Sequence, residues 1–235
     1  RGVGVLDENG RLELSLPVDL AELNGSQILT LEAVVTDLAG SVVSERINVT
    51  AHRSQYYVGV KPVEYVGTVG EEESFEIVVV DWDSQPIASY PAFVEIVERR
   101  WHSVQEEDAQ GRLRWTSTVE EIPVVTQEVT TGSDGKATVT FTPPNGGVFM
   151  ARAHINDPQG NPSIASDYLW VSGREYIPWR QTNSKIFNLV ADKTSYKPGD
   201  TAEILIASPF QGSSYALVTV ERGKVIGHEV VRLET

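Results

Sequence analysis

The chain has 235 residues, of which 40% are hydrophobic, and a formal net charge of −14. This composition supports packed cores and excludes an intrinsically disordered chain, while the acidic charge disfavours nucleic acid and anionic lipid surfaces as partners. There is no cysteine and no apolar run long enough to span a bilayer, which excludes disulfides, thiol nucleophiles, thiolate metal sites and a transmembrane helix.

Alternating apolar and polar residues predict short strands along the whole chain. Residues 11–16 alternate Leu12, Leu14 and Leu16 with polar residues, and Pro17 ends the run. Residues 136–142 show the same period of two with β-branched side chains. Further strands are expected, in chain order, over 28–35, 44–50, 76–80, 148–155, 165–171 and 202–206. Residues 18–23 are too few for a stable helix and are interpreted as a loop or a single turn.

Turn residues separate these strands at short intervals. Asp and Asn tolerate left-handed backbone geometry and cap their own turns, and Gly adopts a positive φ without strain. Such turns are expected at 7–10, 37–40, 133–135, 145–147 and 157–160. Many short strands with this spacing are typical of antiparallel β-sandwiches, so the predicted fold class is all-β with tandem fibronectin- or immunoglobulin-like domains.

An internal repeat predicts how these domains are arranged. The order of turn, alternating strand, longer strand, second turn and closing strand that begins at residue 7 returns at residue 133. Gly10 matches Gly135, and Gly40 matches Gly160. We therefore predict the C-terminal part of one sandwich over 1–53, a complete sandwich over 54–172, a linker over 173–184 and the N-terminal part of a further sandwich over 185–235.

Residues that carry chemistry do not form a catalytic pattern. The four histidines show no His-x-x-x-His spacing, and no serine lies in a Gly-x-Ser-x-Gly elbow. The best calcium candidate is Asp81-x-Asp83 at a strand end, and a solvated turn is the preferred interpretation of that pair. We expect no enzyme activity, no metal and no cofactor.

The aromatic residues are more informative. Trp101 and Trp115 flank the turn around 106–111 and are expected to pair across a hairpin. The predicted linker and its flank are expected to pack two domains together, and the residues proposed for this role are Trp170, Tyr176, Pro178, Trp179 and Arg180. Exposed aromatic residues would instead suit a carbohydrate-binding module, but here several concentrate at a domain boundary.

Several segments resemble the bacterial α2-macroglobulins. Residues 191–202, with the sequence Ala-Asp-Lys-Thr-Ser-Tyr-Lys-Pro-Gly-Asp-Thr-Ala, resemble the start of a macroglobulin domain. Similar matches lie at 79–83, 99–107, 168–173, 177–183, 208–210 and 216–223. The resemblance covers residues 54–235, and residues 1–53 follow from the internal repeat.

The resemblance implies a scaffold role. Family members are chains of macroglobulin β-sandwiches with a protease-cleavable bait and, in most members, a Cys-x-Glu-Gln thioester, and bait cleavage triggers entrapment of the protease. A chain without cysteine holds no thioester, and we expect the bait downstream of residue 235. The implied partners are neighbouring macroglobulin domains of the same chain and, through the full-length protein, target proteases. The implied location is the periplasm, the cell envelope or outside the cell, with any anchor or signal outside this segment. The alternative is a surface adhesin or stalk module, or the carbohydrate-binding sandwich already mentioned.

Overall fold

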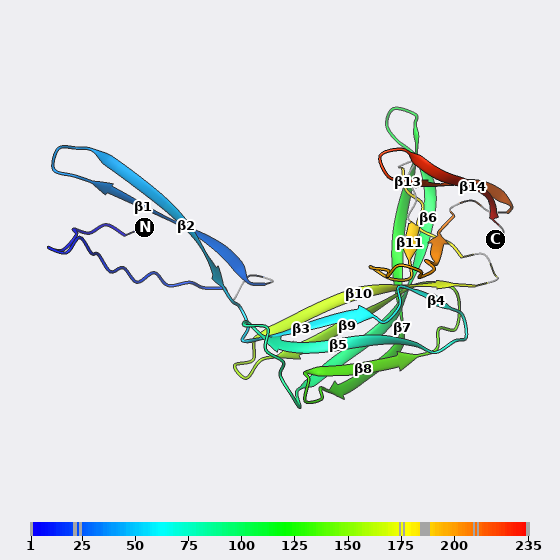
Figure 1. The fold of residues 1–235 in the computed structure, drawn as a ribbon, viewed down its shortest axis with the longest axis horizontal. Helices are drawn as coiled ribbons and strands as arrows, with labels where there is room; N and C mark the ends of the chain where they lie inside the picture. Colours follow the sequence, from blue (N-terminus) through cyan, green and yellow to red (C-terminus); the bar gives the residue numbers. More distant parts are fainter. Residues whose placement is uncertain are drawn as a thin grey trace. The chain divides into compact units, whose positions relative to one another are not determined.

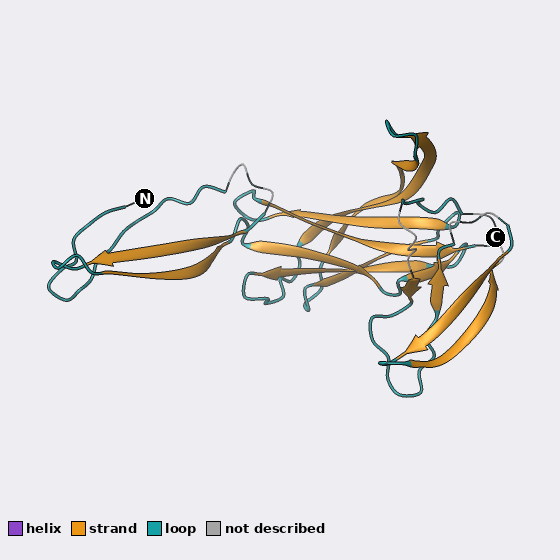
Figure 2. Ribbon diagram, turned by 90° about the horizontal axis from the view of Figure 1, so that it is seen from above, coloured by secondary structure: helices purple, strands orange, loops and turns teal. Residues whose placement is uncertain are grey.

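The computed structural model describes residues 2–20, 23, 25–173, 175, 177–183, 189–208, 210 and 212–233. All the regular structure in this part of the chain is β-strand (Figure 2), so the predicted all-β class is confirmed. The described residues therefore include no helix able to cross a bilayer. The chain divides into two units, one of residues 1–55 with 157–161 and one of residues 56–156 with 162–235.

The first unit contains one antiparallel hairpin, formed by β1 (Gln27–Thr36) and β2 (Val42–Ala51). One face is polar: Thr30 Oγ1 donates to Asn48 Oδ1 over 2.8 Å, and Arg46 pairs with Glu32 at 3.1 Å. The register places most of the apolar side chains together on the opposite face, namely Leu29, Leu31, Val35, Val43, Ile47 and Val49. The hairpin is thus amphipathic, and the strands predicted over 28–35 and 44–50 are confirmed.

The strand predicted over 11–16 is wrong. The chain turns where Asp7 N–H donates to the Arg11 carbonyl over 2.9 Å, but among the described residues no ladder of backbone hydrogen bonds continues beyond this turn. The side chains of Leu12, Leu14 and Leu16 stay largely exposed, at 42%, 51% and 53%, although Leu14 lies close to the backbone of Gly2. Alternation selects an apolar face, but a strand also needs a neighbour that accepts its backbone hydrogen bonds.

The second unit contains a β-sandwich made of two sheets (Figure 1). The smaller sheet has the order β3 (Tyr56–Pro62), β5 (Glu73–Asp81) and β8 (Lys136–Phe141), all antiparallel. The larger sheet has the order β4 (Val66–Thr68), β10 (Pro162–Ser172), β9 (Gly147–Asn156), β6 (Pro91–Glu107) and β7 (Leu113–Thr130). The short strand β4 runs parallel to β10, and the other pairs are antiparallel.

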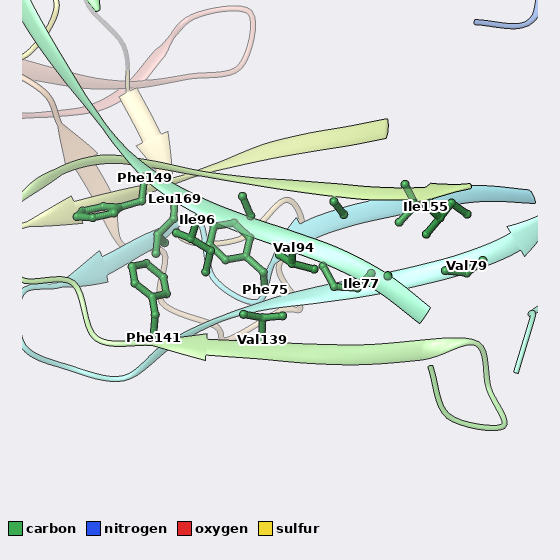
Figure 3. Packing of buried hydrophobic residues seen from close by; sticks show 14 of the residues in the cluster. Phe75, Ile77, Val79, Val94, Ile96, Val139, Phe141, Phe149, Ile155 and Leu169 are labelled. Carbon is green, nitrogen blue, oxygen red and sulfur yellow. The ribbon is translucent and has the colours of Figure 1, made fainter. Parts of the chain in front are cut away.

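The core lies between these two sheets (Figure 3). The smaller sheet contributes Phe75, Ile77, Val79, Val139 and Phe141, and the larger sheet contributes Val94, Ile96, Phe149, Ile155 and Leu169. The ring of Phe141 packs against two others, with its centroid 6.1 Å from Phe75 and 5.4 Å from Phe149. Period-two patterning therefore delivers one apolar face from each sheet to a single layer.

Two small two-stranded sheets follow the sandwich in the chain. One pairs β11 (Leu189–Ala191) with β12 (Ile204–Ile206), and the other pairs β13 (Ser214–Glu221) with β14 (Val225–Leu233). Strand β12 confirms the C-terminal part of the strand predicted over 202–206. The domain assignments over 1–53, 54–172, 173–184 and 185–235 stay predictions.

One turn recurs five times in the described part of the chain, four times at the end of a strand. In each instance the aspartate N–H bonds to the carbonyl four residues on, and its Oδ1 accepts the N–H groups two and four residues on. The residue three positions after the aspartate has a positive φ, and it is Gly in every turn but one, where it is Ser84 with a φ of 62°. The turns begin at Asp7, Asp37, Asp81, Asp108 and Asp157. Asp81 therefore caps its own turn, as the interpretation of a solvated turn requires.

Asp157 also binds a segment that lies far from it in the sequence. Its buried carboxylate also accepts, through Oδ2, the Gln55 N–H at 2.9 Å and the Asn161 side-chain amide at 3.0 Å. Burial raises the pKa of Asp157, but these hydrogen bonds together with those to the turn outweigh it and lower the pKa to about 2 from 3.8. The ionised form is therefore the one that stabilises the fold.

Core packing gives the first prediction. Phe75→Ala removes a fully buried ring and should cost roughly 3–5 kcal/mol in the free energy of unfolding. Phe93→Ala is the matched control because that ring is 46% exposed, and it should cost less than about 1 kcal/mol. Urea unfolding followed by tryptophan fluorescence measures both, and equal losses would contradict the assigned core.

Asp157 gives the second prediction. Its folded pKa lies below its unfolded value of 3.8, so its contribution is present above pH 4 and declines as the pH falls toward about 2. The corresponding stabilisation at neutral pH is about 2 kcal/mol. Asp157→Asn should remove it and flatten this part of the pH dependence, whereas Asp7→Asn, at the equivalent position of an exposed turn, should change it little. Urea unfolding by circular dichroism between pH 5 and pH 2.5 measures this, and identical slopes for wild type and Asp157→Asn would refute it.

Candidate functional site

The strands β6 and β7 extend beyond the rest of their sheet (Figure 1). They are 17 and 18 residues long, but β9 pairs with β6 only from Phe93 to Arg99. Residues 100–120, here called the arm, therefore form a two-stranded projection closed by the Asp108 turn. An isolated two-stranded ribbon is only marginally stable, so the arm needs support from another part of the chain.

That support comes from residues 177–183, here called the docked segment, which contact β10 and then the arm. Trp179 lies against Trp170 of β10, with ring centroids 5.5 Å apart and planes at 34°. The guanidinium of Arg180 lies over the ring of Trp101, 4.8 Å from its centroid. Both contacts join the docked segment to the larger sheet through aromatic faces, where stacking and cation–π attraction add to apolar burial.

Hydrogen bonds continue this contact toward the tip of the arm. Gln181 N–H donates to Ser103 Oγ over 3.1 Å, and Ser117 Oγ donates to the Gln181 carbonyl over 3.0 Å. Further along, Trp115 N–H donates to Asn183 Oδ1 over 2.6 Å, and Asn183 Nδ2 donates to the Trp115 carbonyl over 3.0 Å. The side-chain amide of Asn183 thus takes the place of a neighbouring strand at Trp115.

Arg99 connects the base of the arm to two other strands. Its guanidinium lies 5.1 Å from the ring centroid of Trp101 and 5.5 Å from that of Tyr168. Nη1 donates to the Tyr168 hydroxyl over 3.2 Å, and Nε lies 3.4 Å from the carboxylate of Glu121. A positive charge shared by two rings and a carboxylate fixes β6, β7 and β10 against one another.

The seam beneath the docked segment is closely packed. A Cβ on Gly146 would lie 2.8 Å from Ile177 Cγ1, so only glycine allows this approach. Beside it, a depression of about 920 Å³ is lined by residues that include Thr68, Glu98, Arg100, Gly146 and Pro178. The side chain of Glu98 is 8% exposed and accepts two hydrogen bonds of 3.1 Å from Arg100. Glu98 and Arg100 therefore neutralise each other, while Glu175 adds a further carboxylate to the lining.

Tyr65 links the sandwich to the following part of the chain. Its N–H donates to the Asp192 carbonyl over 2.9 Å, and its carbonyl accepts the Trp170 N–H over 3.0 Å. Burial and the neighbouring charge of Asp167 raise the pKa of the Tyr65 phenol, so it stays neutral at physiological pH. The backbone of Tyr65 thus joins β10, which carries Trp170, to the segment that begins the next predicted domain.

The Tyr-Lys-Pro-Gly-Asp stretch has a structural role in the second unit. The Tyr196 hydroxyl donates to Asp192 Oδ1 over 2.6 Å, and Glu203 N–H donates to the same oxygen over 3.0 Å. The hydrogen bond from Tyr196 lowers the pKa of Asp192. Lys197 N–H donates to the Asp200 carboxylate over 2.8 Å. The motif is therefore a capped turn that brings β12 back to β11.

The predicted packing residues come together only in part within the described residues. Trp170 contacts Trp179, Arg180 contacts Trp101, and Pro178 lines the seam beside Gly146. Tyr176 lies outside the described residues. The predicted pairing of Trp101 with Trp115 is wrong, because the register places Trp101 opposite Val119 and Trp115 opposite Gln105.

Other contributors were not anticipated from the sequence. They are Tyr65, Ser103, Ser117 and Asn183, which act through backbone groups or through one or two side-chain hydrogen bonds. Such roles leave no spacing pattern in the sequence. Of the sequence features, only the resemblance of residues 177–183 to bacterial α2-macroglobulins pointed to Asn183. Among the described residues, no cluster of three His, Asp or Glu side chains is arranged to hold a metal ion.

Comparison with known proteins agrees with this architecture. The family model described as bacterial macroglobulin domain 6 matches residues 59–152, which include the arm and most of the sandwich. The chain contains a bacterial macroglobulin domain. The resemblance found in the sequence is thereby confirmed. An α2-macroglobulin homologue of Nostoc sp. is 22% identical over 204 residues, covering 87% of this chain and 10% of that protein.

A solved structure extends the match in fold. The native conformation of E. coli α2-macroglobulin aligns with a TM-score of 0.51 and 17% identity over 97% of this chain and 15% of that chain. At this identity the likeness concerns the fold alone. The chain therefore spans only a small part of the length of these relatives.

The docked segment gives the third prediction. A double-mutant cycle of Trp170→Ala and Trp179→Ala should give a coupling of about 1 kcal/mol in the free energy of unfolding, because the two rings are in contact. The control cycle pairs Trp179→Ala with Trp82→Ala, in the turn between β5 and β6, and should be additive. Urea unfolding by circular dichroism measures both cycles, and additivity of Trp170 with Trp179 would show that the docking is not formed.

Proposed function

We propose that the chain is a non-catalytic scaffold segment of a bacterial α2-macroglobulin-like protein that traps proteases after bait cleavage. In this role its partners are the neighbouring macroglobulin domains of the same chain, and proteases meet only the assembled protein. The proposed location is outside the cytoplasm, in the periplasm, the cell envelope or the medium.

The observation that carries the proposal is the docked segment on a domain matched by a bacterial macroglobulin family model. In the proposed domain order, residues 173–184 connect the sandwich over 54–172 to the domain that starts at 185. The stacking of Trp179, the cation–π contact of Arg180 and the hydrogen bonds of Gln181 and Asn183 favour a clamp over a freely moving pivot. A clamp transmits a rearrangement, because motion of one domain then moves the arm of the other.

The alternatives receive less support. A carbohydrate-binding module would present several aromatic faces to solvent, whereas Trp170 and Trp179 lie against each other and Trp101 lies beneath two guanidinium groups. An adhesin or stalk module would use near-identical tandem repeats, and the two copies of the repeat in this chain share order and turns but not sequence.

The fourth prediction tests the scaffold role in the full-length protein that contains this chain. Incubated with a protease, that protein should block digestion of a large protein substrate while leaving hydrolysis of a small peptide substrate intact, because a trapped protease excludes only large substrates. The Trp179→Ala protein should trap more slowly, and Trp82→Ala is the matched control. Failure of the unmodified protein to distinguish the two substrates would refute the proposed function.

A further inference from the structure

The outer edge of β7 is the strand edge of the larger sheet that lies beside the docked segment. β7 is the last strand of this sheet, and within the part of the chain that the structure describes no strand pairs with its outer side. The hydrogen bonds between Trp115 and Asn183 show that the backbone N–H and C=O groups of Trp115 point outward, away from β6. By the alternation of an antiparallel ladder, the groups of residues 113, 117, 119 and 121 point outward as well.

This edge ends at Pro123. Proline has no N–H to donate and is found in edge strands with that side facing outward. The open stretch therefore runs from Leu113 to Glu121. An unpaired edge of this length is a template for another strand unless it is blocked.

The sequence of the open stretch is complementary to itself. If two copies pair antiparallel about Ser117, Arg114 of one copy lies opposite Glu120 of the other, and Trp115 lies opposite Val119. The pairs Arg–Glu, Trp–Val and Thr116–Thr118 are each favourable across antiparallel strands. The parity is also correct, because residues 115, 117 and 119 all present outward backbone groups in this register.

The charged side chains that would form the new pairs are accessible. The side chains of Arg114 and Glu120 are each 57% exposed, and their present partners, Asp108 and His102, belong to the arm itself. Residues 114 and 120 are not outward hydrogen-bonding positions. Across the new interface they would therefore form a non-hydrogen-bonded pair, in which the side chains approach closely. Such exposed pairs exchange partners at little cost.

We propose that the edge of β7 from Leu113 to Glu121 is a self-association edge that joins two copies of this chain, and that Asn183 keeps it closed. The amide of Asn183 occupies the outward N–H and C=O of Trp115, which a second β7 strand would otherwise bind. The interface is a two-fold continuation of one five-stranded sheet into another. It is independent of the scaffold role, because it needs only this chain.

The test uses the 235-residue chain and its molar mass by size-exclusion chromatography with light scattering. Wild type should be mainly monomeric near 25.8 kDa, and Asn183→Ala should shift to twice that mass at the same concentration. A monomeric Asn183→Ala chain that unfolds at the same urea concentration as wild type would overturn the proposal.

Charge variants in the Asn183→Ala background test the register. Arg114→Glu alone and Glu120→Arg alone should each be monomeric, because each places like charges opposite one another. A one-to-one mixture of the two single variants should form a heterodimer, and the double variant should dimerise again. Dimers that persist in either single variant would show that another surface, such as the apolar face of the β1–β2 hairpin, joins the chains, and would overturn the assignment to β7.

Discussion

The structure depends on one layer of apolar side chains between two sheets. Phe75, Phe141 and Phe149 form its centre, and each points into the layer because alternate side chains of a strand lie on the same face of the sheet. Burial of this layer fixes the register of β5, β6 and β9, since a slip by one residue would turn every apolar side chain outward. The base of the arm inherits that register, and the docked segment is positioned by the arm. The packing of the core thus determines where the arm and the docked segment lie.

Beyond the core, the fold has to satisfy strands that leave the sheet. In the part of the chain that the structure describes, no third strand joins the two strands of the arm past Arg99, and residues 177–183 supply contacts instead through two aromatic faces, two serines and one amide. Side chains rather than a backbone ladder carry this docking. A contact made in this way is selective but can be released, because each hydrogen bond between accessible groups contributes only about 1 kcal/mol.

The sequence predicts the strands of the sandwich well and its contacts poorly. The alternation over 136–142 and the turn at 157–160 identify β8 and the loop between β9 and β10 because local patterning and tertiary burial agree there. The same alternation over 11–16 gives no strand, since no partner ladder is present. The Trp101–Trp115 pairing was wrong because the register of a hairpin follows from its turn, and a shift of four positions separates these residues. Asn183 and Tyr65 act through hydrogen bonds that no spacing reveals.

The central claim is that residues 177–183 are held on the arm. Hydrogen–deuterium exchange of the unmodified chain, read by mass spectrometry, tests it through the amides of Gln181 and Trp115, whose N–H groups donate to Ser103 and Asn183. The account predicts slow exchange at both amides, comparable to the paired strands at the base of the arm. Exchange of both within seconds, with the core strands still protected, would contradict it.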